Sequence, residues 1–474
     1  MTDRIVRWLA CVVAPLCPMT LAQAGQIASF EHVVLIVQEN RTPDNLFHGL
    51  CTKAGACSTT PAPGQYNVQT ANWLNKAVAR GMTQPFAEPL NNSYDLSHAH
   101  TAYLQMCDAS PRTGLCRMDG AINVQCTYEC VPYPQFAYVD NSTGQIDPYI
   151  TLVTQYGWAN YMFQTNQGPS FPAHQFLFGA TSAPSAADDH AGRFSAENMG
   201  VADENAGCAA PSDQTVALIN PNGIEDAAIF PCFEHQTLAD LVVKHGFTWR
   251  YYAVSAGSIW TAPNAIRHLC QPVGPDCTGP AWQANVDVVP SDVLADIANC
   301  QLRNLTWVTP TGQNSDHPHG NTGGGPSWVA SIVNAIGNSA CKDSGTSYWD
   351  DTAIIITWDD WGGWYDHVVP PYMAPPQSGY QYGFRVPLIV VSAYTQKGYI
   401  DNSQFDFGSI ARFVEHNFLV HMGALTFADA RTTTDLLKFF DLARSPRAFT
   451  TIPAPLSAKH FIEDKTPPLP PDND

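Results

Sequence analysis

Two short, continuously apolar runs end directly in acidic residues, and this feature constrains the fold more than any other. The run His32–Gln38 is followed at once by Glu39-Asn40, and the run Ala353–Trp358 by Asp359-Asp360. Apolar runs without alternation are typical of strands that are covered on both faces. Because ligands bind beyond the carboxyl ends of parallel strands, we expect three carboxylates and one amide oxygen to share one crevice.

Carboxylates that crowd into one crevice repel one another unless a cation neutralises them. Oxygen ligands favour a hard divalent ion. The sequence therefore predicts one divalent metal ion, for which Ca²⁺, Mg²⁺ or Mn²⁺ suit the oxygen ligands and Zn²⁺ is a further option. The alternative is that each acid only caps a helix or lies in a loop.

Other segments extend the strand and helix pattern. Two more runs, Val386–Val391 and Leu305–Thr309, read as strands. Apolar residues at a spacing of three to four predict helices over Thr237–His245, Ser327–Ile336 and Ser409–Leu419. Strands that alternate with helices indicate an α/β fold, with a central, largely parallel sheet sandwiched by helices.

The first 24 residues have the pattern of a secretory signal peptide. Arg4 and Arg7 precede a short apolar stretch, and Ala22-Gln23-Ala24 gives the small-x-small pattern of a cleavage site. The alternative is an uncleaved N-terminal anchor. No later segment offers about 20 uninterrupted apolar residues. We therefore expect an exported protein, secreted or periplasmic, without stable membrane insertion.

The remaining chain is expected to form one domain over residues 25–464, followed by a disordered proline- and acid-rich tail at 465–474. Residues 50–150 and 180–235, rich in Cys, Pro, Asn and Gly, read as loop insertions that roof the site.

Cysteine usage agrees with export. Two of the 14 cysteines lie in the leader, and the even number that remains indicates disulfides in an oxidising compartment. The pairs Cys51/Cys57, Cys126/Cys130 and Cys270/Cys277 are close enough to close small loops, but the connectivity stays open. No CxxC pair occurs, which argues against a zinc–thiolate site.

Charge excludes one class of partner. The chain carries 42 acidic and 23 basic residues, a formal net charge of −19. Binding of a nucleic-acid backbone needs clustered Lys and Arg, so we expect no nucleic-acid partner.

The segments around the acidic residues resemble a known family. Val33–Phe47 contains a match to the signature E-N-R-[ST]-x-D, and Thr357–Pro371 matches T-[YW]-D-[ED]-x-G-G-x-[FWY]-D-H-V-x-P-P. Both are similar to signatures of the bacterial phosphoesterase family, which contains the non-haemolytic phospholipases C and related acid phosphatases. The resemblance implies an alkaline-phosphatase-like fold and a metal-assisted attack by a hydroxyl side chain. It also implies a set of metal ligands: Glu39, Asn40, Ser170, Asp359 and Asp360.

The implied nucleophile is Ser170. The segment Gln167–Phe176 resembles the family block G-x-[ST]-x-x-[NH]. A serine hydroxyl becomes a good nucleophile only when a metal or a base activates it. The alternative is an ordinary turn serine near a helix start. His174, four residues later, would assist Ser170 if the segment is helical.

Histidines of two further segments are implied to face the substrate phosphate. His317 matches the histidine of a [SE]-[ED]-H-P block, whereas His319 lies outside that pattern. His98 best fits a second substrate-side histidine, with His100 close by. A histidine can neutralise charge on phosphoryl oxygens or protonate the leaving alcohol; the alternative is a solvent-exposed loop.

Three residues inside the signatures have open roles. Asp366 and His367 either orient a metal-bound carboxylate or hold the loop. Arg41 either reaches the phosphate or a carboxylate, or fixes the turn.

Absent motifs narrow the chemistry. The chain contains no C-x-[PA]-x-R sulfatase motif, no D-S-A block with paired D-x-x-x-H ligands, and no G-x-S-x-G elbow. One metal ion and a serine nucleophile remain as the reading of the site.

The sequence thus predicts an exported phosphoric ester hydrolase of the acid phosphatase or phospholipase C type. The acidic composition and the short remainder after the second signature lean toward soluble phosphate esters over phospholipids. A non-catalytic binding protein on the same fold is the alternative, and the oligomeric state stays open.

Overall fold

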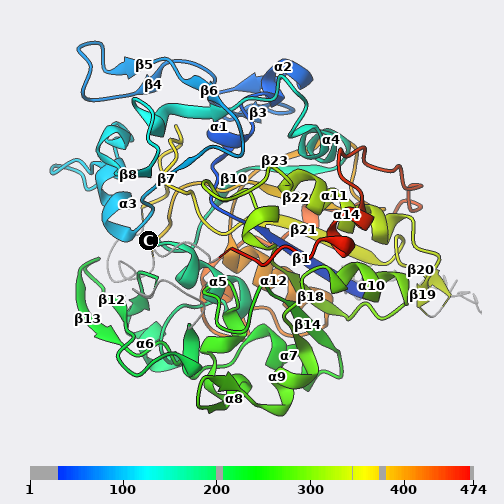
Figure 1. Cartoon of the computed structure of the whole chain (residues 1–474). Helices are drawn as coiled ribbons and strands as arrows, with labels where there is room; N and C mark the ends of the chain where they lie inside the picture. The colour runs from blue at the N-terminus through cyan, green and yellow to red at the C-terminus, as the bar shows by residue number, and fades with distance from the viewer. Residues whose placement is uncertain (1–29, 199–205, 344, 373–380, 470–474) are drawn as a thin grey trace, which may run out of the picture.

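An eight-stranded sheet runs through the middle of the molecule (Figure 1). The computed structural model describes residues 30–198, 206–343, 345–372 and 381–469. The leader predicted at residues 1–24 and the last five residues of the predicted tail lie outside these ranges.

The sheet is largely parallel, as the sequence predicts. In spatial order its strands are β17 (Val286–Asp287), β14 (Trp249–Tyr252), β18 (Leu305–Val308), β1 (His32–Gln38), β21 (Thr352–Trp358), β22 (Leu388–Val391), β10 (Gly157–Phe163) and β23 (Tyr399–Asp406). Only β22 runs antiparallel to its neighbours; the other strands share one direction.

Helices cover both faces of the sheet. Trp307 of β18 pairs in register with Leu35, and Trp358 of β21 pairs with Gln38. Successive side chains of a strand point to opposite faces, so the two tryptophans lie on opposite faces. Trp307 Nε1 donates to the carbonyl of Leu177 in α5 at 3.1 Å, while the Trp358 ring lies 5.2 Å from that of Tyr149 in α4.

The two helix layers follow from these contacts (Figure 1). One layer contains α5 (Ser170–Gly179), α7 (Leu238–Lys244) and α12 (Phe407–Asn417). The other contains α4 (Asp147–Gln155), α10 (Asp292–Ala298), α11 (Gly325–Gly337) and α14 (Ala458–Glu463). The three helices predicted from sequence correspond to α7, α11 and α12.

The insertion between β1 and β10 builds its own small apolar core. Residues of the insertion, among them Trp73, Tyr94 and Met106, pack with Trp361 and Trp364 from the segment after β21. This contact places the insertion over the carboxyl end of β21, where the sequence predicts a roof.

Smaller elements complete the chain. The helices are α1 (Pro43–Leu46), α2 (Leu50–Ala54), α3 (His100–Cys107), α6 (Ala186–His190), α8 (Arg267–Cys270), α9 (Pro280–Asn285) and α13 (Ala428–Arg431). The short strands are β2 (Cys57–Ser58), β3 (Tyr66–Asn67), β4 (Trp73–Leu74), β5 (Met82–Thr83), β6 (Phe86–Glu88), β7 (Tyr94–Leu96), β8 (Cys126–Tyr128), β9 (Ala137–Val139), β11 (Phe194–Ser195), β12 (Val216–Ile219), β13 (Glu225–Ile229), β15 (Pro272–Val273), β16 (Asp276–Cys277), β19 (Lys342–Asp343) and β20 (Thr346–Ser347). Single 3₁₀ turns occur at Ala121–Asn123, Pro134–Phe136, Gly207–Ala209, Ala262–Ala265, Gly312–Asn314 and Leu437–Phe439.

Six disulfides confirm the prediction from the cysteine count. They join Cys51–Cys57, Cys107–Cys116, Cys126–Cys130, Cys208–Cys232, Cys270–Cys277 and Cys300–Cys341. The first, third and fifth pairs are those that the sequence places within reach of each other.

The described part of the tail, residues 465–469, lies against the loop that carries His317. Leu469 N donates to Gln313 Oε1 at 3.2 Å, and a Cβ atom added at Gly312 or Gly320 would meet the Leu469 side chain, at 3.4 and 3.0 Å. These contacts involve only the first half of the tail that the sequence predicts to be disordered. Among the described residues, no helix combines the length and apolar character that crossing a bilayer requires.

Candidate active site

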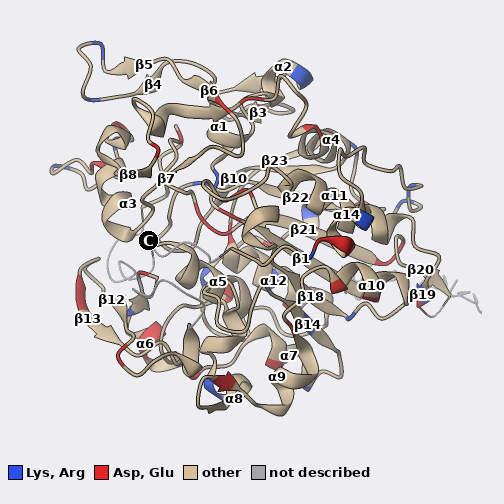
Figure 2. Ribbon diagram, in the orientation of Figure 1, with Lys and Arg blue, Asp and Glu red and all other residues tan. Residues whose placement is uncertain are grey.

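The ends of β1 and β21 bring Glu39 and Asp359 side by side. Gln38 pairs with Trp358 in register, and Asp359 N donates to Gln38 O at 3.0 Å. One residue on, Asn40 N donates to Asp359 Oδ1 at 3.1 Å. The expected convergence of the two strand ends is thus present, and acidic segments meet near the middle of the molecule, at the end of β1 (Figure 2).

Two tight turns, one after each strand, hold these segments together. Asn40 has a left-handed backbone, with φ of 60°, and Gly362 has φ of 62°. A Cβ atom added at Gly362 would lie 2.3 Å from Asn40 O. The glycine therefore allows the segment after β21 to approach the segment after β1.

His174 reaches these acids from α5, in the helix layer that also contains α7 and α12. Its Nε2 lies 3.3 Å from Glu39 Oε1 and 3.7 Å from Asp359 Oδ2. Because the segment is helical, His174 lies one turn beyond Ser170 on the same face of α5. Glu39, His174 and Asp359 together offer ligand atoms that all lie within 4.8 Å of one another.

The ligand atoms of this cluster are buried without hydrogen-bond partners. These atoms are both Oε atoms of Glu39, Oδ1 of Asn40, Oδ2 of Asp359 and both ring nitrogens of His174. Buried polar atoms normally have partners, so a group of unpartnered oxygens and nitrogens fits a bound cation. The residues present therefore suit the divalent metal ion that the sequence predicts.

The electrostatics of the cluster support the same fit. Burial, followed by the charge of Asp359, raises the pKa of Glu39 and of Asp360 well above the ordinary carboxyl value. Burial lowers the pKa of His174 to about 4, against the opposing effect of Asp359. The imidazole is therefore neutral near pH 7, and only protons or a cation can neutralise the acids.

Ser170 stands at the first turn of α5, beside Asp360. Its Oγ donates to Asp360 Oδ2 at 3.2 Å, while Asp360 Oδ1 accepts from Gly362 N at 2.7 Å. The next residue of the helix, Phe171, donates its N–H to Asn198 Oδ1 at 2.8 Å. The N-terminal end of a helix favours negative charge, so Ser170 lies where an anion is stabilised.

His98 and His317 face the same region from two loops. Their ring centroids lie 6.0 Å apart, and the charges of both lower the pKa of Asp360, against the larger effects of burial and Asp359. His98 Nδ1 donates to Leu96 O at 2.8 Å, which leaves Nε2 as the acceptor for Asn40 Nδ2 at 2.9 Å. The Asn40 amide is thereby oriented with Oδ1 toward the carboxylates.

Arg41 lies away from the acids of the cluster. Its guanidinium donates to the carbonyls of Asp316 and Leu90 and to the side chains of Asn45 and Asn92. Burial lowers its pKa to about 10. These contacts tie the loop of His317 to the turn after β1.

Asp366 and His367 belong to a separate network. Asp366 forms two hydrogen bonds with Arg385, at 2.9 Å each, and His367 Nδ1 donates to Asp44 Oδ2 at 2.7 Å. Arg385 NH2 also lies 3.4 Å from Asp44 Oδ1. The network holds the loop of the second signature.

His100 and His319 likewise have partners of their own. His100 Nδ1 lies 2.7 Å from Glu225 Oε1, and the exposed ring of His319 stacks on Tyr128 at 3.7 Å. No hydrogen bond or ion pair that the structure resolves joins either ring to Ser170 or Asp360.

The sequence analysis did not identify two acidic residues near the site. Asp316 is buried; its Oδ2 accepts from Tyr149 OH at 2.7 Å and from Trp358 Nε1 at 3.0 Å, and burial raises its pKa to about 6. Its position directly before His317 was a usable signal. Glu197 accepts from His100 N at 3.1 Å, and burial raises its pKa to about 8, helped by Glu225; no motif marks it.

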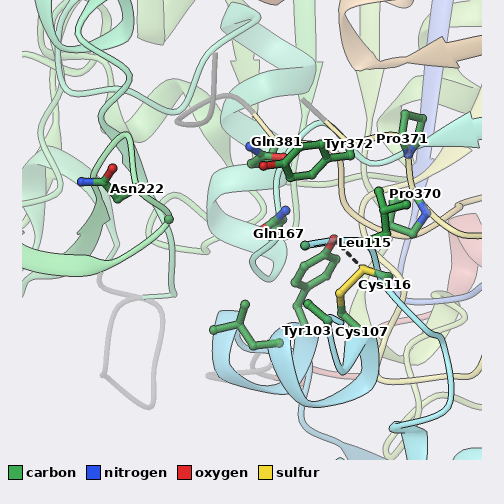
Figure 3. A pocket seen from close by; sticks show the side chains of 14 residues that line it. Tyr103, Cys107, Leu115, Cys116, Gln167, Asn222, Pro370, Pro371, Tyr372 and Gln381 are labelled. Carbon is green, nitrogen blue, oxygen red and sulfur yellow. Dashed lines mark hydrogen bonds between the residues drawn. A yellow bond between two sulfur atoms is a disulfide. The ribbon is translucent and has the colours of Figure 1, made fainter. Parts of the chain in front are cut away.

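A cleft of about 250 Å³ opens beside these segments (Figure 3). Its walls are largely apolar or aromatic and come from Tyr103, Leu104, Cys107, Ala109, Gly114, Leu115, Cys116, Gln167, Asn222, Gly223, Pro370, Pro371, Tyr372 and Gln381. In Figure 3 the side chain of Gln167 lies between those of Tyr103 and Tyr372. Gln167 is three residues before Ser170, so their Cα atoms lie at most about 11 Å apart.

Known proteins resemble this chain over much of its length. The model of the Phosphoesterase family matches residues 30–421. Phospholipase C B of Mycobacterium tuberculosis is 30% identical over 177 residues, which are 33% of this chain and 33% of that protein. Phospholipase C A of the same organism is 23% identical over 463 residues, 90% of this chain and 79% of that protein. The match thus spans about a third of the first of these relatives.

One solved structure extends the comparison. A protein of the alkaline phosphatase superfamily from Vibrio parahaemolyticus is 13% identical, covers 61% of this chain and 64% of its own, and has a TM-score of 0.33.

Proposed function

Because the chain belongs to the Phosphoesterase family, we propose that it is an exported, metal-dependent phosphoric ester hydrolase in which Ser170 is the nucleophile. The observation that carries the proposal is the position of the Ser170 hydroxyl. It donates to Asp360 at the positive end of α5, next to the cluster of buried, unpartnered ligand atoms.

Glu39, Asn40, Asp359 and Asp360 would hold the metal ion together with Ser170. When bound, a divalent ion lowers the pKa of a hydroxyl and neutralises charge on phosphoryl oxygens. The tight turn at Gly362 and the register of β1 with β21 pre-position these groups, so little reorganisation accompanies substrate binding.

In the first step Ser170 Oγ attacks phosphorus in line with the leaving alcohol. The Oγ–P bond forms, the bond from phosphorus to the leaving oxygen breaks, and the hydroxyl proton passes to Asp360, which already accepts it. The leaving oxygen takes a proton from a nearby histidine. In the second step water attacks the phosphoserine and its proton passes to that histidine. The bond from phosphorus to Ser170 Oγ breaks, and Asp360 returns its proton to this oxygen, which restores Ser170.

His98 and His317 are suited to cradle the remaining phosphoryl oxygens. Their rings approach the region of Asp360 from two sides. Each ring donates Nδ1–H to a backbone carbonyl, His98 to Leu96 and His317 to Pro318. Those bonds fix both rings. Because His98 Nε2 accepts from Asn40 Nδ2, the Nε2 atom of His317 is the one that exchanges a proton.

Within this reaction class, the cleft favours a phospholipase C type of substrate over a small phosphate ester. Its apolar walls suit the hydrocarbon part of an amphiphilic leaving group, and Gln167 connects it to Ser170 over three residues. The names of the relatives agree. Export is supported by the six disulfides, which persist in oxidising compartments.

The direct test compares p-nitrophenyl phosphate, p-nitrophenyl phosphorylcholine and phosphatidylcholine vesicles as substrates, from pH 4 to pH 8. We expect hydrolysis of the phosphorylcholine ester and of the vesicles to exceed that of the monoester. Higher kcat/KM for the monoester would assign a phosphatase. Absence of hydrolysis with all three, in protein loaded with divalent metal, would favour a non-catalytic binding protein.

Replacing Ser170 by Ala should lower kcat by at least about a thousandfold, because the attacking oxygen is lost. The melting temperature should change little, since Ala fits the same helix start. Ser331→Ala is the matched control: it removes a buried helix serine that bonds only within α11. If S170A retained near-normal turnover, Ser170 would not be the nucleophile.

A further inference from the structure

His174 stands among the acids as the one nitrogen donor of the cluster. Nε2 approaches Glu39 Oε1 and Asp359 Oδ2 at 3.3 and 3.7 Å, and all three side chains are buried. Neither ring nitrogen has a hydrogen-bond partner. A buried imidazole without partners is costly, so its position between two carboxylates calls for a ligand.

The separations suit a shared ion. Zinc lies about 2.1 Å from imidazole nitrogen and carboxylate oxygen, which places neighbouring ligands about 3.0 Å apart in an octahedral shell and about 3.4 Å apart in a tetrahedral one. Calcium, at about 2.4 Å, gives similar separations in a wider shell, so the distances alone do not select the metal. The donor type does, because calcium and magnesium take oxygen ligands whereas imidazole suits zinc and its neighbours.

The second acidic cluster of the chain provides a contrast. Asp44, Asp366 and His367 also bring ligand atoms within 4.8 Å of one another. There the guanidinium of Arg385 neutralises both acids, and the histidine has its carboxylate partner.

Around the first cluster the situation differs. In the part of the chain that the structure describes, no Lys or Arg forms an ion pair with Glu39, Asp359 or Asp360, and the ion pairs of these acids are with histidines. Arg385 thus neutralises the second acidic cluster, whereas a bound metal ion would neutralise the first.

His174 lies one residue beyond the last position of the family block that this segment resembles. In the block G-x-[ST]-x-x-[NH], the last position falls on Ala173, and the imidazole comes from the following residue. One residue later on α5 means a rotation of about 100°. The side chain is thereby directed at Glu39 and Asp359.

We propose that His174 Nε2 is a direct ligand of the bound ion, and that the site therefore selects a zinc-type cation over Ca²⁺ or Mg²⁺. This inference rests on the metal dependence proposed above and adds the class of ion. It also assigns His174 a position on the metal, in place of the assisting role that the sequence predicts for it.

The test measures metal content and affinity, independently of turnover. Chelator-treated full-length protein is dialysed against equal concentrations of Zn²⁺, Mn²⁺, Mg²⁺ and Ca²⁺, and bound metal is counted by elemental analysis. We expect about one Zn²⁺ per chain. His174→Asn, which exchanges the nitrogen donor for an amide oxygen, should lower Zn²⁺ affinity by at least about tenfold and change Mg²⁺ and Ca²⁺ affinity by less than about twofold.

Co²⁺ absorption gives a second readout, since loss of a nitrogen ligand shifts the visible bands. His235→Asn is the matched control, because it removes a buried histidine whose Nδ1 bonds a backbone carbonyl away from the cluster; its metal preference should equal that of the wild type. Circular dichroism and the melting temperature establish that each variant is folded. His174→Gln is the second variant at this position, and it is used if His174→Asn does not fold.

Two results would overturn the inference: unchanged Zn²⁺ affinity in both folded His174 variants, or wild-type protein that takes up Ca²⁺ or Mg²⁺ in preference to Zn²⁺. In either case hydrolysis that depends on Ser170 would leave the proposed function intact. Failure of hydrolysis with every metal, in protein that binds Zn²⁺ through His174, would instead reject the proposed function and retain the site.

Discussion

At the scale of single residues, backbone conformation decides which atoms face the ion. The left-handed Asn40 turns its amide so that Nδ2 meets His98 and Oδ1 remains among the carboxylates. Gly362 N meanwhile holds Asp360 Oδ1 at 2.7 Å. The two turns touch backbone to backbone, so the geometry of one sets that of the other.

Gly362→Ala is expected to disturb both turns. A left-handed alanine costs about 1–2 kcal/mol, and its Cβ would meet Asn40 O at 2.3 Å, which adds about 1–3 kcal/mol of steric strain. Gly64→Ala is the matched control: it is left-handed too, but its Cβ has no neighbour within 4 Å. Urea unfolding should show a larger loss of stability for G362A, with a loss of kcat/KM that G64A lacks; equal losses would mean that the contact with Asn40 is unimportant.

At the scale of elements, Glu415 of α12 and Asp429 of α13 accept hydrogen bonds from the backbone of one loop. Glu415 accepts from Gly423 N at 2.6 Å and from Ala424 N at 3.0 Å, while Asp429 accepts from Phe427 N at 2.7 Å. Burial, followed by the charge of Asp429, raises the pKa of Glu415 to about 8. The folded protein therefore holds a proton here that an unfolded glutamate, with a pKa near 4.5, releases.

This proton gives stability a defined pH dependence. A carboxyl whose pKa rises on folding binds more protons in the native state, so the unfolding free energy falls as pH rises from about 4.5 to about 8. Each pKa unit corresponds to about 1.4 kcal/mol. Glu415→Gln, which mimics the protonated side chain, should flatten this decline and be the more stable protein at pH 8. Denaturant titrations at pH 5 and pH 8 test it, with the exposed Glu463→Gln as control; parallel profiles for wild type and E415Q would contradict the shift.

The elements nearest the site were the most predictable from sequence. β1 has the predicted bounds, and β21 begins one residue earlier than predicted. Both strands were predictable because they are buried on both faces, which gives a continuous apolar run. β10 was missed because Asn160 interrupts its apolar run, although that side chain is buried and bonded to Gln65 O and Asn402. The edge strand β23 carries exposed polar residues, so its pattern resembles a loop.

The residues of the site also differ in how far the sequence predicts their positions. Glu39 and Asp359 meet because β1 and β21 are adjacent and in register, and the continuous apolar runs before these acids predict both strands. The contact of His174 depends on how α5 is rotated against the sheet, and no local pattern encodes that. Asp366 and His367 pair with Arg385 and Asp44, partners that only the tertiary fold brings together.

At the scale of the whole molecule, the disulfides differ in how much chain they constrain. Cys126–Cys130 closes a separation of 4 residues within the insertion, whereas Cys300–Cys341 spans 41 residues. The longer loop contains β18, the His317 segment and α11. Its bridge thus encloses part of the central sheet and one side of the site.

Removing the two bridges should therefore have unequal effects on stability. The loop entropy lost from the unfolded chain is worth about 4 kcal/mol for a loop of this longer size and about 2 kcal/mol for the shorter one. Replacing Cys300 and Cys341 by Ala should lower the unfolding free energy about 2 kcal/mol more than replacing Cys126 and Cys130, as measured by urea unfolding under non-reducing conditions. Removing the Cys300–Cys341 bridge should also lower activity, because the loop between these cysteines carries His317. Equal losses would indicate that the unfolded chain is already compact across residues 300–341, since only residual structure there removes the entropy that the longer bridge restricts.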